Sequence, residues 1–145
     1  MNSDRSFLLF PLMLTRLRKS RGLLQKTAAL DLGIDPTVLC AIEKGTRTPL
    51  DNSQINKLVD VFRLSEEEAI HLRWAAHHDR LVGHLESRGA TSTEVAFIST
   101  ALHALRHLQP QQISGLIASL QQIDKSASLV ASLGKSNLLM EVAMS

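Results

Sequence analysis

Residues 22–49, GLLQKTAALDLGIDPTVLCAIEKGTRTP, contain the pattern that decides the fold of this chain. The segment 25–32 has the composition of a short helix, with a pair of small alanines available for close packing against a second helix. Gly33 follows it directly, and glycine supplies the positive φ that a sharp exit from a helix needs. These residues predict one short helix that ends in a tight turn.

A second helix is expected immediately after this turn. Asp35 is a preferred N-cap residue, and Pro36 occupies the first helical position, where its missing N–H costs nothing. The helix is expected to continue to Lys44 and to end at Gly45. Two short helices joined in this way are a helix-turn-helix.

The rest of the chain also predicts helices, so the expected fold class is all-α. Aromatic residues are only 3% of the 145 residues, tyrosine is absent, and strand signals are weak. Capping boxes at Ser65 with Glu68 and at Thr91 with Glu94 each predict a helix start. The further expected helices cover about 11–20, 52–62, 65–88, 91–108, 110–120 and 125–133, the last of them ending at Gly134.

The compartment is predicted from cysteine usage and from the amino-terminal residues. The single Cys40 cannot form an intramolecular disulfide, so the cytoplasm is the expected location. The apolar run 7–14 is too short to span a bilayer and is interrupted by Pro11, so we interpret it as core and expect no membrane association. Residues 1–10 are expected to form an N-terminal arm.

Basic residues are concentrated around the helix-turn-helix. Residues 1–50 contain eight Lys or Arg and four acidic residues, whereas residues 51–90 contain five basic and seven acidic residues. Residues 91–145 are neutral, with three residues of each sign. A basic surface at the helix-turn-helix is what contact with DNA phosphates requires, although an ordinary solvated surface would also be basic in places.

Several spaced motifs resemble one family of DNA-binding domains. L-R-x-x-R-G-L at 17–23, Gln25, Ala29, L-G-I at 32–34 and I-E-K-G-x-R-x-P at 42–49 are similar to the Cro and phage-repressor type, or XRE family. The resemblance covers about 12–64 and implies a five-helix domain, whose bounds we expect at 11–64. It also implies that the helix from Pro36 to Lys44 enters the major groove of double-stranded DNA, usually in a dimer on a pseudo-palindromic operator.

The resemblance assigns roles to individual residues. It implies that Gln25, at the start of the first helix of the motif, contacts a phosphate or a base edge. It implies that Arg18 and Glu43 form a structural ion pair that ties the first helix to the third. The cations that flank the second helix of the motif, and that we expect the core not to use, are candidate phosphate contacts: Arg21, Lys26, Lys44 and Arg47.

The outer face of the second helix departs from the family pattern. Many relatives carry Gln, Arg, Asn or Ser there, whereas this chain has Thr37, Val38 and Ala41, which offer one hydroxyl and some methyl contacts. One interpretation is that these residues, Lys44 and DNA shape supply the specificity. The other is that the domain has lost DNA binding and serves as a protein adaptor.

Three other residue groups have an ordinary explanation as well as a functional one. His103 and His107 are spaced like two zinc ligands, but no third ligand is nearby in the sequence, so we expect no metal or cofactor. The histidines of the long helix could sense pH, although a solvent-exposed helix also accounts for them: His71, His77, His78 and His84. Cys40 could be a thiol switch or, more simply, a small buried residue. Because no enzyme motif is present, we expect no catalytic activity.

The C-terminal region, 65–145, is expected to mediate association. Its apolar helical stripes, with few charges after residue 90, would leave large apolar patches exposed on a monomer. A homodimer or a shared helical bundle would cover them, and a pocket for a small effector or a peptide between these helices is a further option. The sequence therefore predicts a dimeric transcriptional regulator, most simply a repressor. The alternative is an antitoxin or adaptor whose C-terminal helices hold a partner protein.

Overall fold

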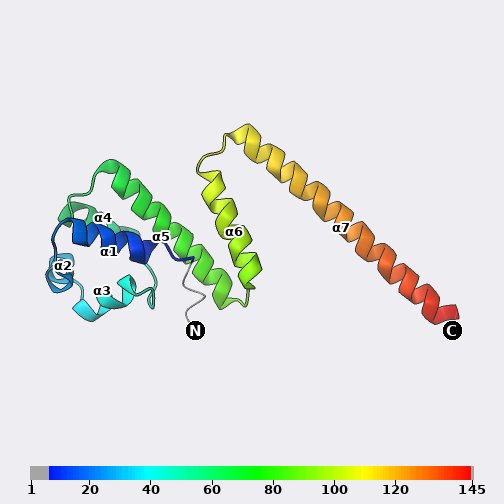
Figure 1. The fold of residues 1–145 in the computed structure, drawn as a ribbon, viewed down its shortest axis with the longest axis horizontal. Coiled ribbons are helices and arrows are strands. Elements are labelled where there is room, and N and C mark those ends of the chain that lie inside the picture. The colour runs from blue at the N-terminus through cyan, green and yellow to red at the C-terminus, as the bar shows by residue number, and fades with distance from the viewer. Residues whose placement is uncertain (1–6, 145) are drawn as a thin grey trace. The chain divides into compact units, whose positions relative to one another are not determined.

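The computed structural model describes residues 7–144, and these contain seven α-helices and no strand (Figure 1). The helices are α1 (Phe10–Ser20), α2 (Gln25–Leu32), α3 (Pro36–Glu43), α4 (Asn52–Val61), α5 (Glu66–Ser87), α6 (Ser92–Leu105) and α7 (Pro110–Met144). The predicted all-α fold class is therefore confirmed. Residues 1–6 of the expected N-terminal arm lie outside the described residues.

Local capping signals place several helix ends as predicted, although the helix expected over 91–108 ends at Leu105 and those expected at 110–120 and 125–133 are one helix. Gly33 ends α2 with φ of 70°, and Gly45 follows α3 with φ of 74°. At the start of α5, the Ser65 hydroxyl accepts a hydrogen bond from the Glu68 N–H at 3.1 Å, and the Glu68 carboxylate accepts one from the Ser65 N–H at 2.9 Å. These contacts lie within a few residues of sequence, so the sequence alone could predict them.

The chain divides into two compact units, residues up to Leu102 and residues from His103 onward. This division differs from the expected boundary at residue 65. The reason is that α5 packs against α1 and α4 and contributes Leu72, Ala75 and Ala76 to the same core. Helix α5 therefore shares the core of α1 to α4.

The core of the first unit lies among α1 to α5. Phe10 and Leu14, from the apolar run 7–14, are fully buried, as the prediction of a core segment requires. One face of each helix of the helix-turn-helix is buried as well: Ala28, Ala29, Leu32, Leu39 and Ile42. Helices α2 and α3 are thus held by burial of one face each, which leaves their opposite faces toward solvent.

A buried polar network joins α5 to α6 and to the start of α1. Asp79 accepts hydrogen bonds from the N–H groups of Leu9 at 3.0 Å and Phe10 at 2.8 Å. His78 Nδ1 lies 2.8 Å from Asp79 Oδ1, and His78 Nε2 lies 2.9 Å from Ser99 Oγ. The interpretation of His78 as a residue of a solvent-exposed helix is therefore wrong, because its side chain is fully buried.

Helix α7 is one continuous helix of 35 residues. The predicted end at Gly134 is wrong, since Gly134 is not among the glycines with positive φ. A glycine in a helix interior costs only about 1 kcal/mol relative to alanine, which the helix-forming neighbours offset. None of the described residues of α7 is buried. Among residues 7–144, no helix is both long and apolar enough to cross a membrane.

Candidate nucleic-acid interface

The start of α3 is fixed by its N-cap residue. The Asp35 carboxylate accepts hydrogen bonds from the Thr37 hydroxyl at 2.5 Å and from the Thr37 N–H at 2.8 Å. These two bonds lower the pKa of Asp35, the side-chain bond being the larger cause. The cap therefore stays charged at neutral pH, and it also orients the hydroxyl of Thr37.

The outer face of α3 presents few polar groups. Thr37 is exposed, Ala41 is half-buried, and Val38 is half-buried because it packs against the core. Cys40 on the same helix is a half-buried free thiol. The one hydroxyl of this face, on Thr37, is already bonded to the cap. The structure therefore offers methyl groups and one hydroxyl at the predicted reading positions, and Val38 is only partly accessible.

An ion pair fixes α3 against α1. Arg18 Nε lies 2.6 Å from Glu43 Oε1, and the exposed fractions of the two side chains are 11% and 6%. The Arg18 guanidinium also donates to the carbonyl oxygen of Leu23 at 2.7 Å. The residues that the family resemblance assigned to an ion pair therefore form one.

Gln25 belongs to the same network. Its side-chain amide donates a hydrogen bond to the second carboxylate oxygen of Glu43, and its side chain is half-buried at the start of α2. This contact links the first helix of the motif to the second. Sequence reasoning placed Gln25 at the DNA surface but did not predict that Glu43 holds it in position.

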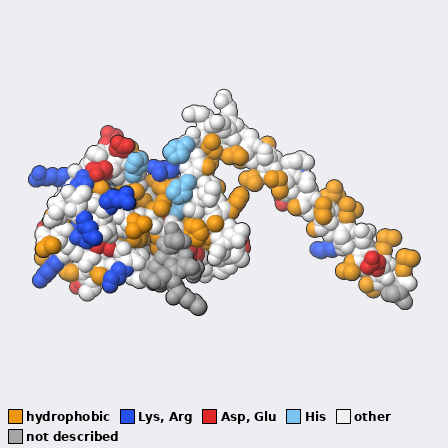
Figure 2. All heavy atoms as spheres, in the orientation of Figure 1, with side chains coloured by type: hydrophobic (Ala, Val, Ile, Leu, Met, Phe, Trp, Pro, Cys, Tyr) orange, Lys and Arg blue, Asp and Glu red, His pale blue; other side chains and the backbone are white. Residues whose placement is uncertain are grey.

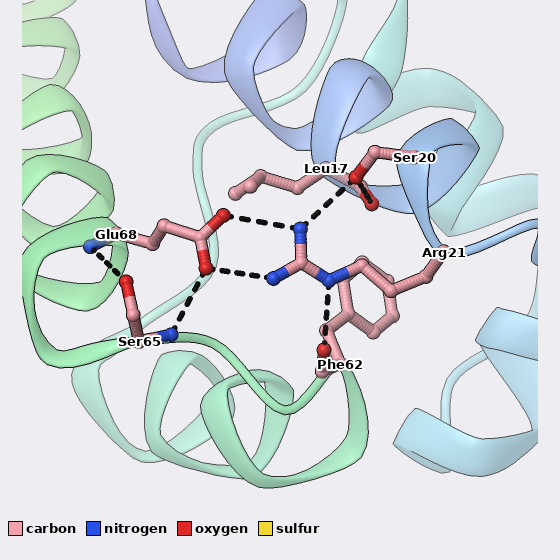
Figure 3. A network of polar contacts seen from close by, with 6 residues as sticks. All are labelled: Leu17, Ser20, Arg21, Phe62, Ser65 and Glu68. Carbon is pink, nitrogen blue, oxygen red and sulfur yellow. Dashed lines mark hydrogen bonds and ion pairs between the residues drawn. The ribbon is translucent and has the colours of Figure 1, made fainter.

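The structure removes Arg21 from the set of candidate phosphate contacts. Its guanidinium donates to both carboxylate oxygens of Glu68, at 2.7 and 3.1 Å, and to the carbonyl oxygen of Phe62 at 3.0 Å (Figure 3). A further bond reaches the Ser20 hydroxyl at 2.9 Å. The expectation that the core does not use Arg21 is thus wrong, because this residue ties α1 to the start of α5.

The remaining predicted cations lie at the surface of the first unit. Lys26 on α2, Lys44 at the C-cap of α3 and Arg47 in the following loop are exposed. On the face shown in Figure 2, Lys and Arg side chains are spread over the first unit. Lys44 and Arg47 directly follow α3 in the chain, and Lys44 also has an interaction within the chain. The three exposed side chains therefore stay candidates for phosphate contacts.

Sequence reasoning also missed some contacts of the first unit. The Arg80 guanidinium donates to the carbonyl oxygen of Leu50 and so anchors the loop that follows α3. No local signal points to this bond, because its partners are far apart in the chain. Within residues 7–144, no group of three or more His, Cys, Asp or Glu side chains could hold a metal ion.

The comparisons with known proteins do not identify a relative. No protein-family model matches this chain, and neither the curated proteins nor the solved structures contain a match to it. The case for a function therefore depends on the residues and contacts described above.

Proposed function

We propose that this chain is a sequence-specific DNA-binding transcriptional regulator, with a repressor-like arrangement of α1 to α5. In this proposal α3 enters the major groove and α2 lies across the phosphate backbone. The observation that supports it most directly is the α2–α3 pair itself. The turn at Gly33, the Asp35 cap and the Arg18–Glu43–Gln25 network together hold α3 in one orientation with its outer face in solvent.

Most of the affinity is expected to come from phosphate contacts. Lys26, Lys44 and Arg47 are the cations that we assign to this role. Each contact adds about 0.9 to the steepness with which the logarithm of the DNA-binding constant falls with the logarithm of the salt concentration. Thr37 and Ala41 supply the methyl groups that can contact thymine, while the half-buried Val38 contributes less. Sequence-dependent DNA shape then accounts for much of the specificity.

We further propose that α7 brings two copies of the chain together. All of its large apolar residues are at least partly exposed in the single chain, and several of them are more than half exposed, including Ile123 at 63%. A homodimer would bury them, as soluble proteins avoid large exposed apolar patches. Two α3 helices could then be held about 34 Å apart, which is one turn of the duplex.

A mobility-shift assay with the upstream region of the chain's own gene tests the proposal. We expect a specific shift that weakens with salt. Lys44→Ala combined with Arg47→Ala should weaken DNA binding and reduce the steepness of its salt dependence, in log–log units, by about 2. Arg88→Ala, at the C-cap of α5, is the control. No specific shift, or equal loss in the control, would count against DNA binding.

The exposed residues of α7 also support a second candidate, an antitoxin or adaptor that holds a different protein. This candidate predicts a stable one-to-one complex with the product of a neighbouring gene, and no DNA shift by the chain alone. Co-expression of the two genes followed by size-exclusion chromatography with light scattering distinguishes the two. A homodimer that excludes the neighbouring product rules the adaptor out.

A further inference from the structure

A cavity of about 490 Å³ lies in the first unit, between the loop after α3 and the second half of α5. Residues 45–49 of that loop form one side, residues of α5 form the other, and the start of α1 contributes to the lining. This volume is within the range of about 300–1,000 Å³ that small-molecule sites occupy. The cavity is separate from the exposed face of α3.

Gly83 of α5 lines this cavity. It lies inside the 22-residue helix α5, where glycine is disfavoured relative to alanine. Its φ is not positive, and a Cβ at this position would meet no atom of residues 7–144 within 4 Å. Neither the backbone nor packing therefore requires glycine. Because glycine has no side chain, the space beside this position remains part of the cavity.

The walls of the cavity combine apolar and cationic groups. Phe10, Pro11 and Ile42 provide apolar surface, whereas Arg47 and Arg80 provide positive charge. The guanidinium of Arg80 uses one donor on the carbonyl oxygen of Leu50, and a guanidinium has five N–H donors.

The lining also contains two acidic residues, Asp79 and Glu86, so its formal charge is balanced. The Asp79 carboxylate is occupied by the N–H groups of Leu9 and Phe10 and by His78. Glu86 has an interaction of its own within the chain. Because the Asp79 carboxylate is already hydrogen-bonded within the chain, Arg47 and Arg80 are the groups that a ligand with an apolar body and one negative group would pair with.

We propose that this cavity is a binding site for a small amphipathic organic anion. The carboxylate or phosphate of the ligand pairs with Arg47 and Arg80, and its apolar part packs on Phe10, Pro11 and Ile42. One consequence rests on the proposed function: because Arg47 is also assigned to DNA phosphate, the bound anion competes for it. Ligand binding should then weaken DNA binding.

Calorimetric titration of the full chain with octanoate tests the site without DNA, and 1-octanol is the uncharged probe of the same length. We expect saturable binding of octanoate, at least tenfold tighter than that of octanol. Gly83→Leu should weaken octanoate binding at least tenfold because the new side chain fills the cavity. Gly115→Leu is the matched control, since Gly115 is also helical, has no positive φ and has open space around it. Arg80→Gln should also weaken octanoate binding at least tenfold.

The location is checked by amide chemical shifts of the wild-type chain, which do not depend on any variant folding. Octanoate should shift the signals of residues 45–49 and 80–87. Shifts confined to α7, no saturable binding, or full binding by Gly83→Leu would each overturn the site, and equal binding of octanol would overturn the anionic ligand.

These measurements test the ligand site and the proposed DNA-binding function independently. Octanoate binding without any DNA shift would retain the site and exclude the regulator. If both the ligand site and the DNA-binding function are correct, octanoate should weaken the mobility shift of DNA by the wild type. It should not weaken the mobility shift by Gly83→Leu.

Discussion

Arg18 on α1 and Glu43 on α3 stand 25 residues apart in the chain, and their side chains meet with Nε 2.6 Å from Oε1. Both side chains are nearly buried, so this pair fixes the outward-facing helix of the candidate interface to the core. Burial of a charge is costly unless it is paired, which makes each partner dependent on the other.

Removing the carboxylate of Glu43 should therefore destabilise the chain strongly. We expect Glu43→Leu to lower the free energy of unfolding by about 3–5 kcal/mol, because the charge of Arg18 is left uncompensated. Combining it with Arg18→Met should recover most of the loss, since an apolar pair can replace a buried ion pair. Urea unfolding followed by circular dichroism measures both. Arg16→Ala, at an exposed position of the same helix, is the control and should change the free energy by less than about 0.5 kcal/mol.

The ion pair between Arg21 and Glu68 predicts a pH dependence of stability. The Arg21 hydrogen bonds, and then the bond from the Ser65 N–H, lower the pKa of Glu68 from 4.5 to about 2. A carboxyl whose pKa is lower in the folded state stabilises the fold above its unfolded pKa. The contribution of Glu68 is thus complete above about pH 5 and is lost as the pH falls toward 2.

Glu68→Gln isolates this effect, because glutamine keeps the shape of the side chain and can still complete the capping box. We expect the variant to unfold at lower urea concentration than the wild type at pH 7 and at the same concentration near pH 2. Glu67→Gln, in the same turn of α5, makes the same change of charge and is the control. A difference between Glu68→Gln and the wild type that persists at pH 2 would contradict the assignment.

The features that the sequence could predict are those that depend on neighbouring residues. Gly33, Asp35 and the Ser65–Glu68 box act within a few residues, so their chemistry fixes the helix ends without knowledge of the rest of the chain. The continuity of α7 through Gly134 is the local exception, because a single glycine is a weak signal that favourable neighbours override.

The features that the sequence could not predict depend on partners that are far apart along the chain. Arg21 appears in the sequence as one of several cations beside the helix-turn-helix, and only the fold brings Glu68 to it, 47 residues away. The buried neighbours His78 and Asp79 are bonded by residues from two other segments: Ser99 contacts His78, and the N–H groups of Leu9 and Phe10 donate to Asp79. Charge alone therefore did not separate Arg21, which links α1 to α5, from the other candidate DNA contacts.

The His78–Ser99 contact predicts that Ser99 contributes to the stability of the fold, although nothing in the sequence singles this serine out. Ser99→Ala should leave His78 Nε2 without this partner in a buried site, at a cost of about 1–3 kcal/mol in the free energy of unfolding. Thr100→Ala, at the adjacent exposed position, should cost less than about 0.5 kcal/mol. Thermal and urea unfolding of the two variants give the comparison. Equal stability of the two would show that the hydrogen bond contributes nothing.

The spacing of apolar residues in the first half of α7 predicts which of its faces mediates self-association. Ile113, Leu116, Leu120 and Ile123 follow one another at intervals of three, four and three residues, the spacing of a coiled-coil seam. The side chains of Leu120 and Ile123 are 49% and 63% exposed in the single chain.

Charges on this seam should therefore separate the two copies. We expect the wild type to sediment as a dimer at micromolar concentration, and Leu120→Asp with Ile123→Asp to sediment as a monomer, because burying an unpaired carboxylate costs several kcal/mol. Gln121→Asp with Gln122→Asp adds the same charges between the two seam positions, on other faces of the helix, and should leave the dimer intact. A monomeric wild type would refute the dimer. If both double variants dissociated equally, the contact would not follow the seam, because charge anywhere on α7 would then be enough to break it.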